Sequence, residues 1–376
     1  MKVGYISNVD IKDRRGWSGT VSYLADTISL HHEVIPIVVE NNKIEKTMKG
    51  MDYVLSVGKR KNGYFCQHYN AYRLHKKIRQ TDCDIYFAPA QSELISFSIP
   101  NDKKLIYLSD AVFRLMVGYY WSELDSRTEE YLDYCEKSAL QRADAVIFSS
   151  KWAKDGAVNF YQTNPQKIHI LPFGANIVDR YQGYQKRDLE NNTIRLLLVG
   201  VEWERKGIDI AIDCVRILNN MQEKYSFDLT IIGVNKPTDQ KYEPYIHILG
   251  RLNKDVPEEY ERMVSYYQNS DLFLLPTKAE CAGIVFAEAA EYGLPSVTHK
   301  TGGVETYVED GITGCCLPLG STGEDFATAI MDIIENGRLE AYSKAARAKY
   351  EKELNWDSWL KSFDAILVDL QKQLAE

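Results

Sequence analysis

The sequence has little that would attach it to a membrane or direct it for export. None of its stretches reaches the roughly 18 consecutive apolar residues of a membrane-spanning helix. The first ten residues, MKVGYISNVD, lead directly into a strand-like segment and lack the apolar stretch of a signal peptide. We therefore expect a cytoplasmic protein, with peripheral contact at the inner membrane face as an open alternative.

The sequence also lacks an excess of positive charge and a regular spacing of cysteines. Lysine and arginine number 45 against 53 aspartates and glutamates, a net charge of −8. Nucleic acid is disfavoured as the main partner, because binding it requires a positive field. The seven cysteines are odd in number and form no C-x-x-C pair, which argues against a zinc site and a disulfide framework. Buried thiols in a reducing compartment are the simpler interpretation.

Two glycine-rich nucleotide motifs are absent as well. No predicted strand is followed by G-x-G-x-x-G, and the sequence contains no G-x-x-x-x-G-K-[ST]. Both a dehydrogenase and a P-loop enzyme therefore become less favoured.

What is present is a repeated alternation of short apolar runs and longer amphipathic stretches. Many of the runs are continuously apolar, as in parallel strands that are covered on both faces. The order of strand then helix occurs in two series, which predicts an α/β fold with two Rossmann-like, doubly wound parallel sheets. The predicted strands are Val3–Ser7, Glu33–Val39, Ile85–Ala88, Lys104–Leu108 and Ala145–Ser149, followed by Ile194–Val199, Asp228–Ile232, Ile246–Leu249, Leu272–Leu275 and Ser296–Thr298.

A polar segment, Gly174–Asn192, separates the two series and predicts the domain boundary. We expect an N-terminal domain over 1–178 and a C-terminal domain over 190–355, consistent with a prior of about two domains for 376 residues. The last segment, 356–376, is predicted to form one amphipathic helix. It either caps the second domain or crosses back to complete the first.

One candidate ligand loop is LLLVGVEWERKGIDIAI at 196–212, since open parallel sheets bind ligands beyond the carboxyl ends of their strands. The strand ends at Gly200, and Arg205 and Lys206 precede a helix that Gly207 opens. Two cations beside free helix-start amides form a good anion site. Two ordinary surface cations on a solvated loop are the alternative.

A second candidate loop lies within 274–299. Glu280 follows a strand, and Glu288 lies about one turn into the next helix. Backbone amides of Cys281–Val285 lie between them and are unpaired where the helix starts. Sugar hydroxyls need both acceptors and donors, and this loop offers both. The alternative is a capping Glu280 and a solvent-facing Glu288.

A third candidate is the GWSGT segment, Gly16–Thr20, between the first strand and the first helix. Glycine lets the backbone approach a ligand closely. A plain flexible turn is an equally favoured interpretation.

Together these pieces resemble the family-four retaining glycosyltransferases of the GT-B fold, also known as glycosyl transferases group 1. The resemblance lies in V-G-x5-K-G followed by E-x-x-G-x4-E-A-x-x-x-G-x-P, then T-G-G-V-E and E-D-G-x-T-G. It is densest over 194–318. The matching residues are Val199, Gly200, Lys206, Gly207, Glu280, Gly283, Glu288, Ala289, Gly293, Pro295, Thr301–Glu305 and Glu309–Gly314.

The resemblance implies a role for each matched position. Arg205 and Lys206 would bind the donor diphosphate and stabilise the leaving group, and Glu280 would lie near the transferred sugar. Glu288 would receive the ribose hydroxyls. The other implied donor-binding residues are Gly16, Ser18, Gly19, Gly200, Leu252, Cys281, Ala282, Gly283, Ile284 and Val285.

Two positions depart from the family pattern. Val201 stands where the family often has arginine, and Asp110, after the fourth strand, stands where many members have a histidine near the donor sugar. We keep Asp110 as a catalytic candidate, because an anion there could accept a sugar hydroxyl.

The implied reaction is a retaining transfer that needs neither a metal nor a cofactor. The nucleotide-diphosphate sugar is a substrate, with a UDP-sugar favoured over a GDP-sugar, and the acceptor is a saccharide or a lipid-linked hydroxyl. Asp82-Cys83-Asp84 has the spelling of a metal motif but precedes a strand. The alternatives are another GT-B enzyme, such as an epimerase or phosphorylase, and a non-catalytic nucleotide-sugar-binding protein.

Two aromatic segments have open interpretations. Tyr119, Tyr120 and Trp121 are either sugar-stacking surfaces or packing residues. The helix predicted at 69–79, YNAYRLHKKIR, could touch anionic lipid, although a solvated basic helix is favoured.

Overall fold

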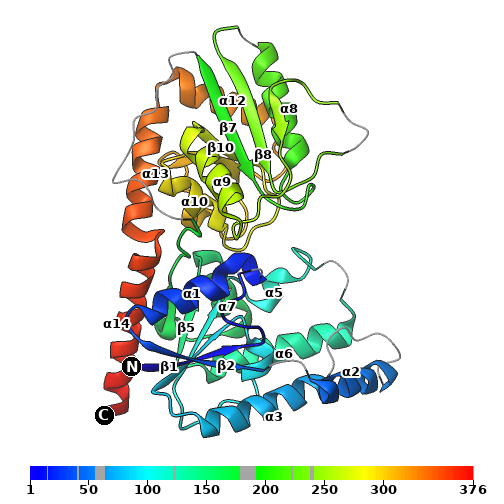
Figure 1. Cartoon of the computed structure of the whole chain (residues 1–376), viewed down its shortest axis with the longest axis vertical. Coiled ribbons are helices and arrows are strands. Elements are labelled where there is room, and N and C mark those ends of the chain that lie inside the picture. Colours follow the sequence, from blue (N-terminus) through cyan, green and yellow to red (C-terminus); the bar gives the residue numbers. More distant parts are fainter. Residues whose placement is uncertain are drawn as a thin grey trace. The chain divides into compact units, whose positions relative to one another are not determined.

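A computed structural model describes residues 1–14, 16–39, 42–55, 64–121, 124–177, 192–221, 223–237 and 241–375. The chain divides into two compact units, Met1–Leu171 with Leu360–Glu376, and Pro172–Trp359. Each unit contains one six-stranded parallel sheet with helices around it (Figure 1). The predicted α/β fold with two doubly wound parallel sheets is confirmed.

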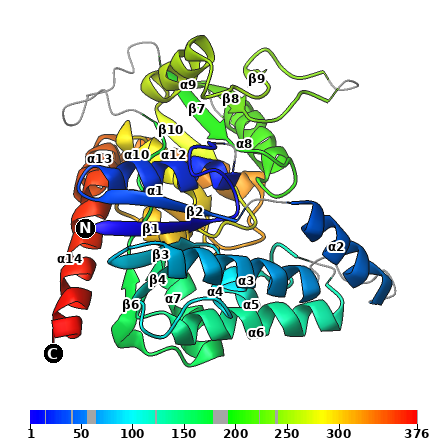
Figure 2. The same ribbon diagram turned by 60° about the horizontal axis from the view of Figure 1, so that its bottom comes forward.

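Unit 1 has the strand order β2-β1-β3-β4-β5-β6. Figures 1 and 2 both show α1 and α3 on opposite sides of β1. The elements are β1 (Lys2–Ser7), α1 (Thr20–Ser29), β2 (Glu33–Val38), α2 (Lys43–Leu55), α3 (Tyr64–Gln80), β3 (Ile85–Pro89), α4 (Ser92–Ile95), β4 (Leu105–Ser109), α5 (Phe113–Met116), α6 (Ser126–Arg142), β5 (Ala145–Phe148), α7 (Lys151–Tyr161) and β6 (Ile168–Ile170).

Unit 2 has the strand order β12-β11-β10-β7-β8-β9. Helix α8 packs against α12, and α10 packs against α13. The elements are β7 (Thr193–Val199), α8 (Ile208–Met221), β8 (Ser226–Ile232), β9 (Ile246–Ile248), α9 (Pro257–Asn269), β10 (Leu272–Leu275), α10 (Ile284–Glu291), β11 (Ser296–His299), α11 (Val304–Tyr307), β12 (Gly314–Leu317), α12 (Gly323–Glu335) and α13 (Leu339–Glu353). A last helix, α14 (Trp356–Ala375), begins in unit 2 and continues into unit 1.

All ten predicted strands are present, and two short edge strands were missed. The inner strands β3, β4, β5 and β10 are buried along their whole length, which explains their continuously apolar sequences. Strand β12 reads GCCL and has no β-branched residue, so its sequence does not predict a strand. Strand β6 reads IHI, as does the predicted β9, so residue types alone do not explain why β6 was missed. Both lie at sheet edges, where one side has no neighbouring strand.

Strand order places the candidate loops at the position where such sheets bind ligands. In unit 2 the chain runs outward from β7 to β9, then returns to add β10 on the other side of β7. The carboxyl ends of β7 and β10 therefore flank the topological switch point, and the loops 200–207 and 276–283 follow these two strands.

Two further features of the predicted organisation are the boundary segment between the domains and the last helix. Within the predicted boundary segment, residues 178–191 lie outside the described residues. In α14, Leu360 and the residues after it belong to unit 1, where Phe363 packs edge-on against Phe87 at a ring distance of 5.4 Å. The apolar residues predicted for this helix, Trp359, Phe363, Ile366, Leu367 and Leu370, are all buried.

The cysteines, the Asp82-Cys83-Asp84 segment and the apolar helices were each the subject of a prediction. All seven cysteines are free, and all but Cys315 are buried. Asp82 and Asp84 both bind Lys2 at the amino end of β3, away from the edge where the sheet binds ligands. Among the described residues, no helix is long and apolar enough to cross a membrane.

Candidate active site

The loop after β7 holds Arg205 in a fixed position. The Arg205 guanidinium donates from Nε and Nη2 to the two carboxylate oxygens of Glu202 at 3.0 and 2.9 Å, and from Nη1 to the Ala279 carbonyl at 3.0 Å. These hydrogen bonds lower the pKa of Glu202. Arg205 thus connects the loops that follow β7 and β10. Glu202 was not among the predicted site residues, although its spacing of three from Arg205 is a signal for such a pair.

Lys206 lies deeper than Arg205. It is 5% exposed and forms an ion pair with Glu280, whose Oε2 also lies 3.6 Å from Arg205 Nη1. The Lys206 side chain crosses Gly200, where an added Cβ would lie 2.9 Å from Lys206 Cγ. Glycine at 200 therefore gives the buried lysine its path. The sequence predicted Lys206, Arg205 and Glu280 as a group, and the structure brings them together.

The charges at this position are nearly balanced. Two cations, Arg205 and Lys206, face two carboxylates, Glu202 and Glu280. The start of α8, immediately after Lys206 and Gly207, adds the partial positive charge of a helix N-terminus. An anion that binds here would compete with Glu280 for Lys206.

The turn from Glu280 to α10 is built on a glycine in the left-handed region. Gly283 has φ 79° and directly precedes α10, and a Cβ there would lie 2.6 Å from the Phe286 ring. The backbone amides of Ile284 and Val285 are at the first turn of α10, while Cys281 and Ala282 are buried. The predicted donor residues 281–285 thus form one continuous turn between the two glutamates.

Glu288 is buried and held by two side chains from other elements. It is 2% exposed, accepts a hydrogen bond from Lys254 Nζ at 2.5 Å and another from the Tyr267 hydroxyl at 2.9 Å. Burial raises the pKa of Tyr267 well above its usual value. The alternative of a solvent-facing Glu288 is therefore wrong. Lys254 and Tyr267 were not predicted, because no local spacing connects them to Glu288.

The HILGRL segment that contains Leu252 is joined to the end of β8. The Gly250 carbonyl accepts a hydrogen bond from the Gly233 amide at 2.8 Å. Lys254, two residues beyond the partly buried Leu252, connects this segment to Glu288.

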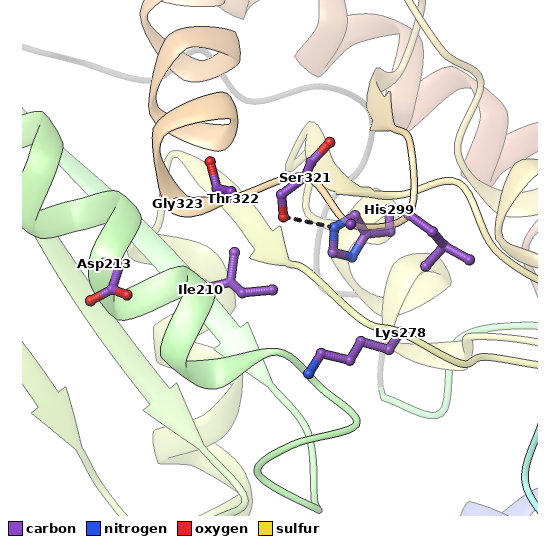
Figure 3. Close-up of a pocket in the computed structure, with 9 residues that line it drawn as sticks. Ile210, Asp213, Lys278, His299, Ser321, Thr322 and Gly323 are labelled. Carbon is purple, nitrogen blue, oxygen red and sulfur yellow. Dashed lines mark hydrogen bonds between the residues drawn. The ribbon is translucent and has the colours of Figure 1, made fainter.

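A separate cavity of about 580 Å³ lies in unit 2 (Figure 3). Its lining includes Lys278 from the loop that carries Glu280, His299, and Ser321 just before α12. The His299 ring is buried, with Nδ1 3.1 Å from the Pro276 carbonyl oxygen and Nε2 3.3 Å from that of Ser321. None of the predicted site residues lines this cavity. We assign the site from the Lys206 and Glu288 clusters, because the charged groups gather there.

Unit 1 brings together the predicted residues at the ends of β1 and β4. The Trp17 indole Nε1 donates to Asp110 Oδ2 at 3.0 Å. Trp17 and Ser18 have φ of 48° and 56°, and Gly19 has 84°. Two non-glycine residues in this region cost on the order of 1–3 kcal/mol each, so the GWSG turn is a constrained turn rather than a flexible one. Gly16, Ser18 and Gly19 thus lie on a turn that Asp110 holds.

The aromatic segment of unit 1 makes packing contacts. The Tyr119 ring lies 5.3 Å from that of Trp152 and 5.5 Å from that of Tyr120. The Trp121 ring lies 5.7 Å from that of Phe113 and is 41% exposed. Tyr119 and Tyr120 are partly buried, whereas Trp121 is exposed and so retains surface for a ligand.

Comparison with known proteins places this geometry in a class. Two solved structures share the fold over almost the whole chain: HepE of Anabaena in complex with UDP and glucose (TM-score 0.66, 15% identity, 98% of this chain and 100% of that one) and the apo lipopolysaccharide outer core galactosyltransferase WaaB (TM-score 0.69, 15% identity, 98% and 99%). The protein therefore has the GT-B fold.

Sequence comparison finds similar proteins and one matching family model. Residues 193–336 match the family described as glycosyl transferases group 1. The chain is similar to a D-inositol 3-phosphate glycosyltransferase of Rhodococcus jostii (25% identity over 236 residues, 59% of this chain and 52% of that protein). It is also similar to a 41.2 kDa protein from the cps region of Klebsiella pneumoniae (22% over 273 residues, 69% and 71%). The chain spans about half the length of the first of these relatives.

Proposed function

We propose that this protein transfers a sugar from a nucleoside diphosphate donor to a hydroxyl acceptor, with retention of the anomeric configuration. One observation carries the proposal: a buried lysine and a paired arginine lie at the switch point of the unit 2 sheet, beside a loop with two glutamates. The match of residues 193–336 to the family described as glycosyl transferases group 1 supports the transfer of a sugar.

In this proposal Lys206 and Arg205 bind the donor diphosphate. Lys206 exchanges its contact with Glu280 for a phosphate oxygen, while Glu202 keeps the Arg205 guanidinium in place. The α8 N-terminus adds its dipole to the same anion. As the bond to the sugar breaks, negative charge grows on the diphosphate, and preorganised cations stabilise it. Glu280, displaced from Lys206, is then free to accept a hydrogen bond from a sugar hydroxyl.

The nucleoside is assigned to Glu288. A carboxylate has two oxygens with about four acceptor positions, so it can bind two ribose hydroxyls in addition to its present partners. Lys254 and Tyr267 fix its orientation. We favour a UDP-sugar over a GDP-sugar, because the similar HepE structures contain UDP or UDP-glucose.

We propose that transfer proceeds without a metal or a separate cofactor. The two side-chain cations and the helix start supply the charge stabilisation that a divalent ion gives in other enzymes. Activity that is unchanged by a chelator would agree with this, and restoration of lost activity by added Mg²⁺ or Mn²⁺ would contradict it.

The acceptor is proposed to be a saccharide or a lipid-linked hydroxyl, bound with the help of unit 1. The Asp110 carboxylate and the GWSG turn lie at the carboxyl ends of β4 and β1, where a parallel sheet presents its ligand residues. Trp121, which is partly exposed, offers a stacking surface.

Donor binding is tested by thermal unfolding in a panel of nucleotides and nucleotide sugars. Ligands that bind the folded state raise the melting temperature. We expect UDP and a UDP-sugar to stabilise the wild type, and Glu288→Gln to lose most of that stabilisation. Glu340→Gln, at an exposed glutamate paired with Lys344 and outside the family motifs, is the matched control. Equal stabilisation of Glu288→Gln and the wild type would contradict the ribose assignment.

Turnover distinguishes transfer from the other GT-B reactions. A transferase releases nucleoside diphosphate from the donor only when an acceptor is present, whereas an epimerase changes the sugar without an acceptor. Donor binding with no turnover for any acceptor would instead indicate a non-catalytic binding protein.

A further inference from the structure

Helix α2 has an inverted arrangement of polar and apolar residues. Its buried charged residues are Glu45 and Asp52, which are 3% and 4% exposed. Its exposed residues include Ile44, Met51 and Val54, at 51, 42 and 74% exposed. These three are separated by seven and three positions, so they share one face of the helix. An ordinary surface helix packs its apolar face inward. Among the described side chains of α2, in contrast, these three apolar residues are exposed and the two carboxylates are buried.

The inward carboxylates of α2 have structural partners. Asp52 accepts hydrogen bonds from the Phe65 and Cys66 amides, both at 2.9 Å, and so caps the start of α3. Glu45 binds Lys49 at 2.7 Å. Because both acids of α2 are buried, no exposed carboxylate remains on the described part of α2, whereas Lys43 and Lys46 are exposed.

Helix α3, which packs against α2, also exposes aromatic and basic side chains. It contains no acidic residue, and Tyr72 is 66% exposed. Tyr72 and Lys76 are four positions apart and therefore lie on one face. Asn42, just before α2, donates to the Tyr69 hydroxyl at 3.1 Å, which ties the two helices together. Figures 1 and 2 both show α2 at the edge of unit 1, away from the sheet.

We propose that this α2–α3 surface binds an anionic lipid bilayer. The α2–α3 surface is defined as Lys43, Ile44, Lys46, Met51, Val54, Tyr72 and Lys76. Apolar side chains flanked by lysines, with an aromatic residue beside them, form the pattern of a helix that lies in a membrane interface.

The charge distribution favours an anionic bilayer at the α2–α3 surface over a second copy of the chain or solvent alone. The chain as a whole carries −8, so a surface with only cationic exposed groups on two helices is local and not a property of the composition. A symmetric contact between two copies would bury this surface on both, and so bring two sets of lysines together with no exposed carboxylate from α2 to pair with them. A purely solvated basic helix, favoured for 69–79 from sequence alone, does not explain three exposed apolar side chains on its neighbour.

The inference is independent of the donor site. If a lipid-linked acceptor is the substrate, the α2–α3 surface would bring the enzyme to it, but binding to vesicles requires no turnover. Failure of the vesicle experiment therefore leaves the donor assignment untouched. Loss of donor binding would likewise leave the vesicle experiment unaffected.

The test is flotation of the purified protein with vesicles of phosphatidylcholine, with and without phosphatidylglycerol, at low and high salt. We expect binding only to the anionic vesicles, and weaker binding at high salt, because salt screens the lysines. Each lysine near an anionic surface is worth about a fivefold change in partitioning, so Lys43→Gln/Lys46→Gln should bind roughly 25-fold less. Ile44→Ser/Met51→Ser/Val54→Ser should bind at least about tenfold less.

Matched controls come from the same unit. Leu30→Ser removes an apolar side chain that is 68% exposed just after α1, and Lys137→Gln removes an exposed charge on α6. Both variants should float as the wild type does. Melting temperatures check that every variant is folded. The proposal is overturned if the wild type does not bind anionic vesicles. It is also overturned if Ile44→Ser/Met51→Ser/Val54→Ser binds them as well as the wild type does. It is also overturned if light scattering shows that the triple variant breaks up a dimer, since a second copy would then cover the surface.

Discussion

At the scale of single residues, Lys206 and Arg205 have different positions although they are adjacent in the sequence. Lys206 is buried against Gly200 and has one carboxylate partner, whereas Arg205 is bound on two sides by Glu202 and the Ala279 carbonyl. Lys206 can exchange its partner by moving one flexible chain. Arg205 is better suited to hold the two loops in register. The lysine is therefore the residue whose removal tests the leaving-group argument.

Lys206→Ala should lower kcat/KM for sugar transfer by about 30- to 1000-fold, since losing one charge-stabilising donor costs about 2–4 kcal/mol of barrier. Steady-state kinetics on the folded variant measure this. Lys278→Ala, an exposed lysine on the neighbouring loop, is the control and should retain its activity. Near-normal transfer by Lys206→Ala would refute the role given to this lysine.

The sequence motif predicted which of these residues gather but not how they pair. Arg205, Lys206 and Glu280 follow from the spacing of the family motif. The contacts of Glu288 do not, because Tyr267 and Lys254 are 21 and 34 positions away from it and come from other elements. Such contacts depend on how elements pack, and a single sequence carries no local signal for them.

At the scale of elements, the GWSG turn shows how a strained segment is kept in place. Trp17 and Ser18 adopt left-handed backbone angles, and the Trp17 indole is bound to Asp110 at the end of β4. The inner strands β3, β4 and β5 of this sheet could be predicted because they are apolar throughout, and the helices because of their periodicity. The turn could not, since the sequence only showed that two glycines permit close approach.

Substitutions at Asp110 distinguish two roles for this residue: holding Trp17 in place by a hydrogen bond, and supplying negative charge to the reaction. Asp110→Asn can still accept the Trp17 hydrogen bond, so we expect it to keep most of the transfer activity. Asp110→Ala cannot, and we expect at least about a tenfold loss, in line with a hydrogen bond to a charged group worth about 1.5–3 kcal/mol. Activity and melting temperature of both variants are measured in parallel. Equal, severe losses of activity in both would show that the charge itself takes part in the reaction.

Helix α6 makes stability depend on pH. Glu136 is buried and accepts a hydrogen bond from Tyr107 at 3.1 Å, and burial raises its pKa to about 7. The folded state therefore holds a proton that the unfolded state has released between the ordinary glutamate value and pH 7. The unfolding free energy should fall as pH rises through this window, by up to about 3 kcal/mol, and stay low above it.

Urea unfolding of the wild type and Glu136→Gln at about pH 5 and about pH 8 measures this effect, because the two values lie on either side of the raised pKa of Glu136. The variant should lose less stability than the wild type over this range. Glu93, whose pKa burial also raises to about 7, should maintain part of the dependence in both proteins. An identical pH dependence of the two proteins would contradict the assignment to Glu136.

At the scale of the whole molecule, the α/β fold with two parallel sheets could be predicted from the sequence, whereas the donor and the acceptor could not. Two series of strand and helix predicted two parallel sheets, and four motif pieces in the right order indicated the glycosyltransferase family. Donor base, sugar and acceptor depend on backbone contacts and on loop shapes, which residue types do not encode. The α2–α3 surface was visible in the sequence only as a basic helix, because the inward direction of Glu45 and Asp52 is a property of the fold.

The most direct test of the central claim is a crystal structure of the protein with UDP bound. We predict that the diphosphate lies within hydrogen-bonding distance of Lys206 and that the ribose hydroxyls contact Glu288. A nucleotide bound far from both residues, for example in the cavity lined by Lys278 and His299, would contradict the account.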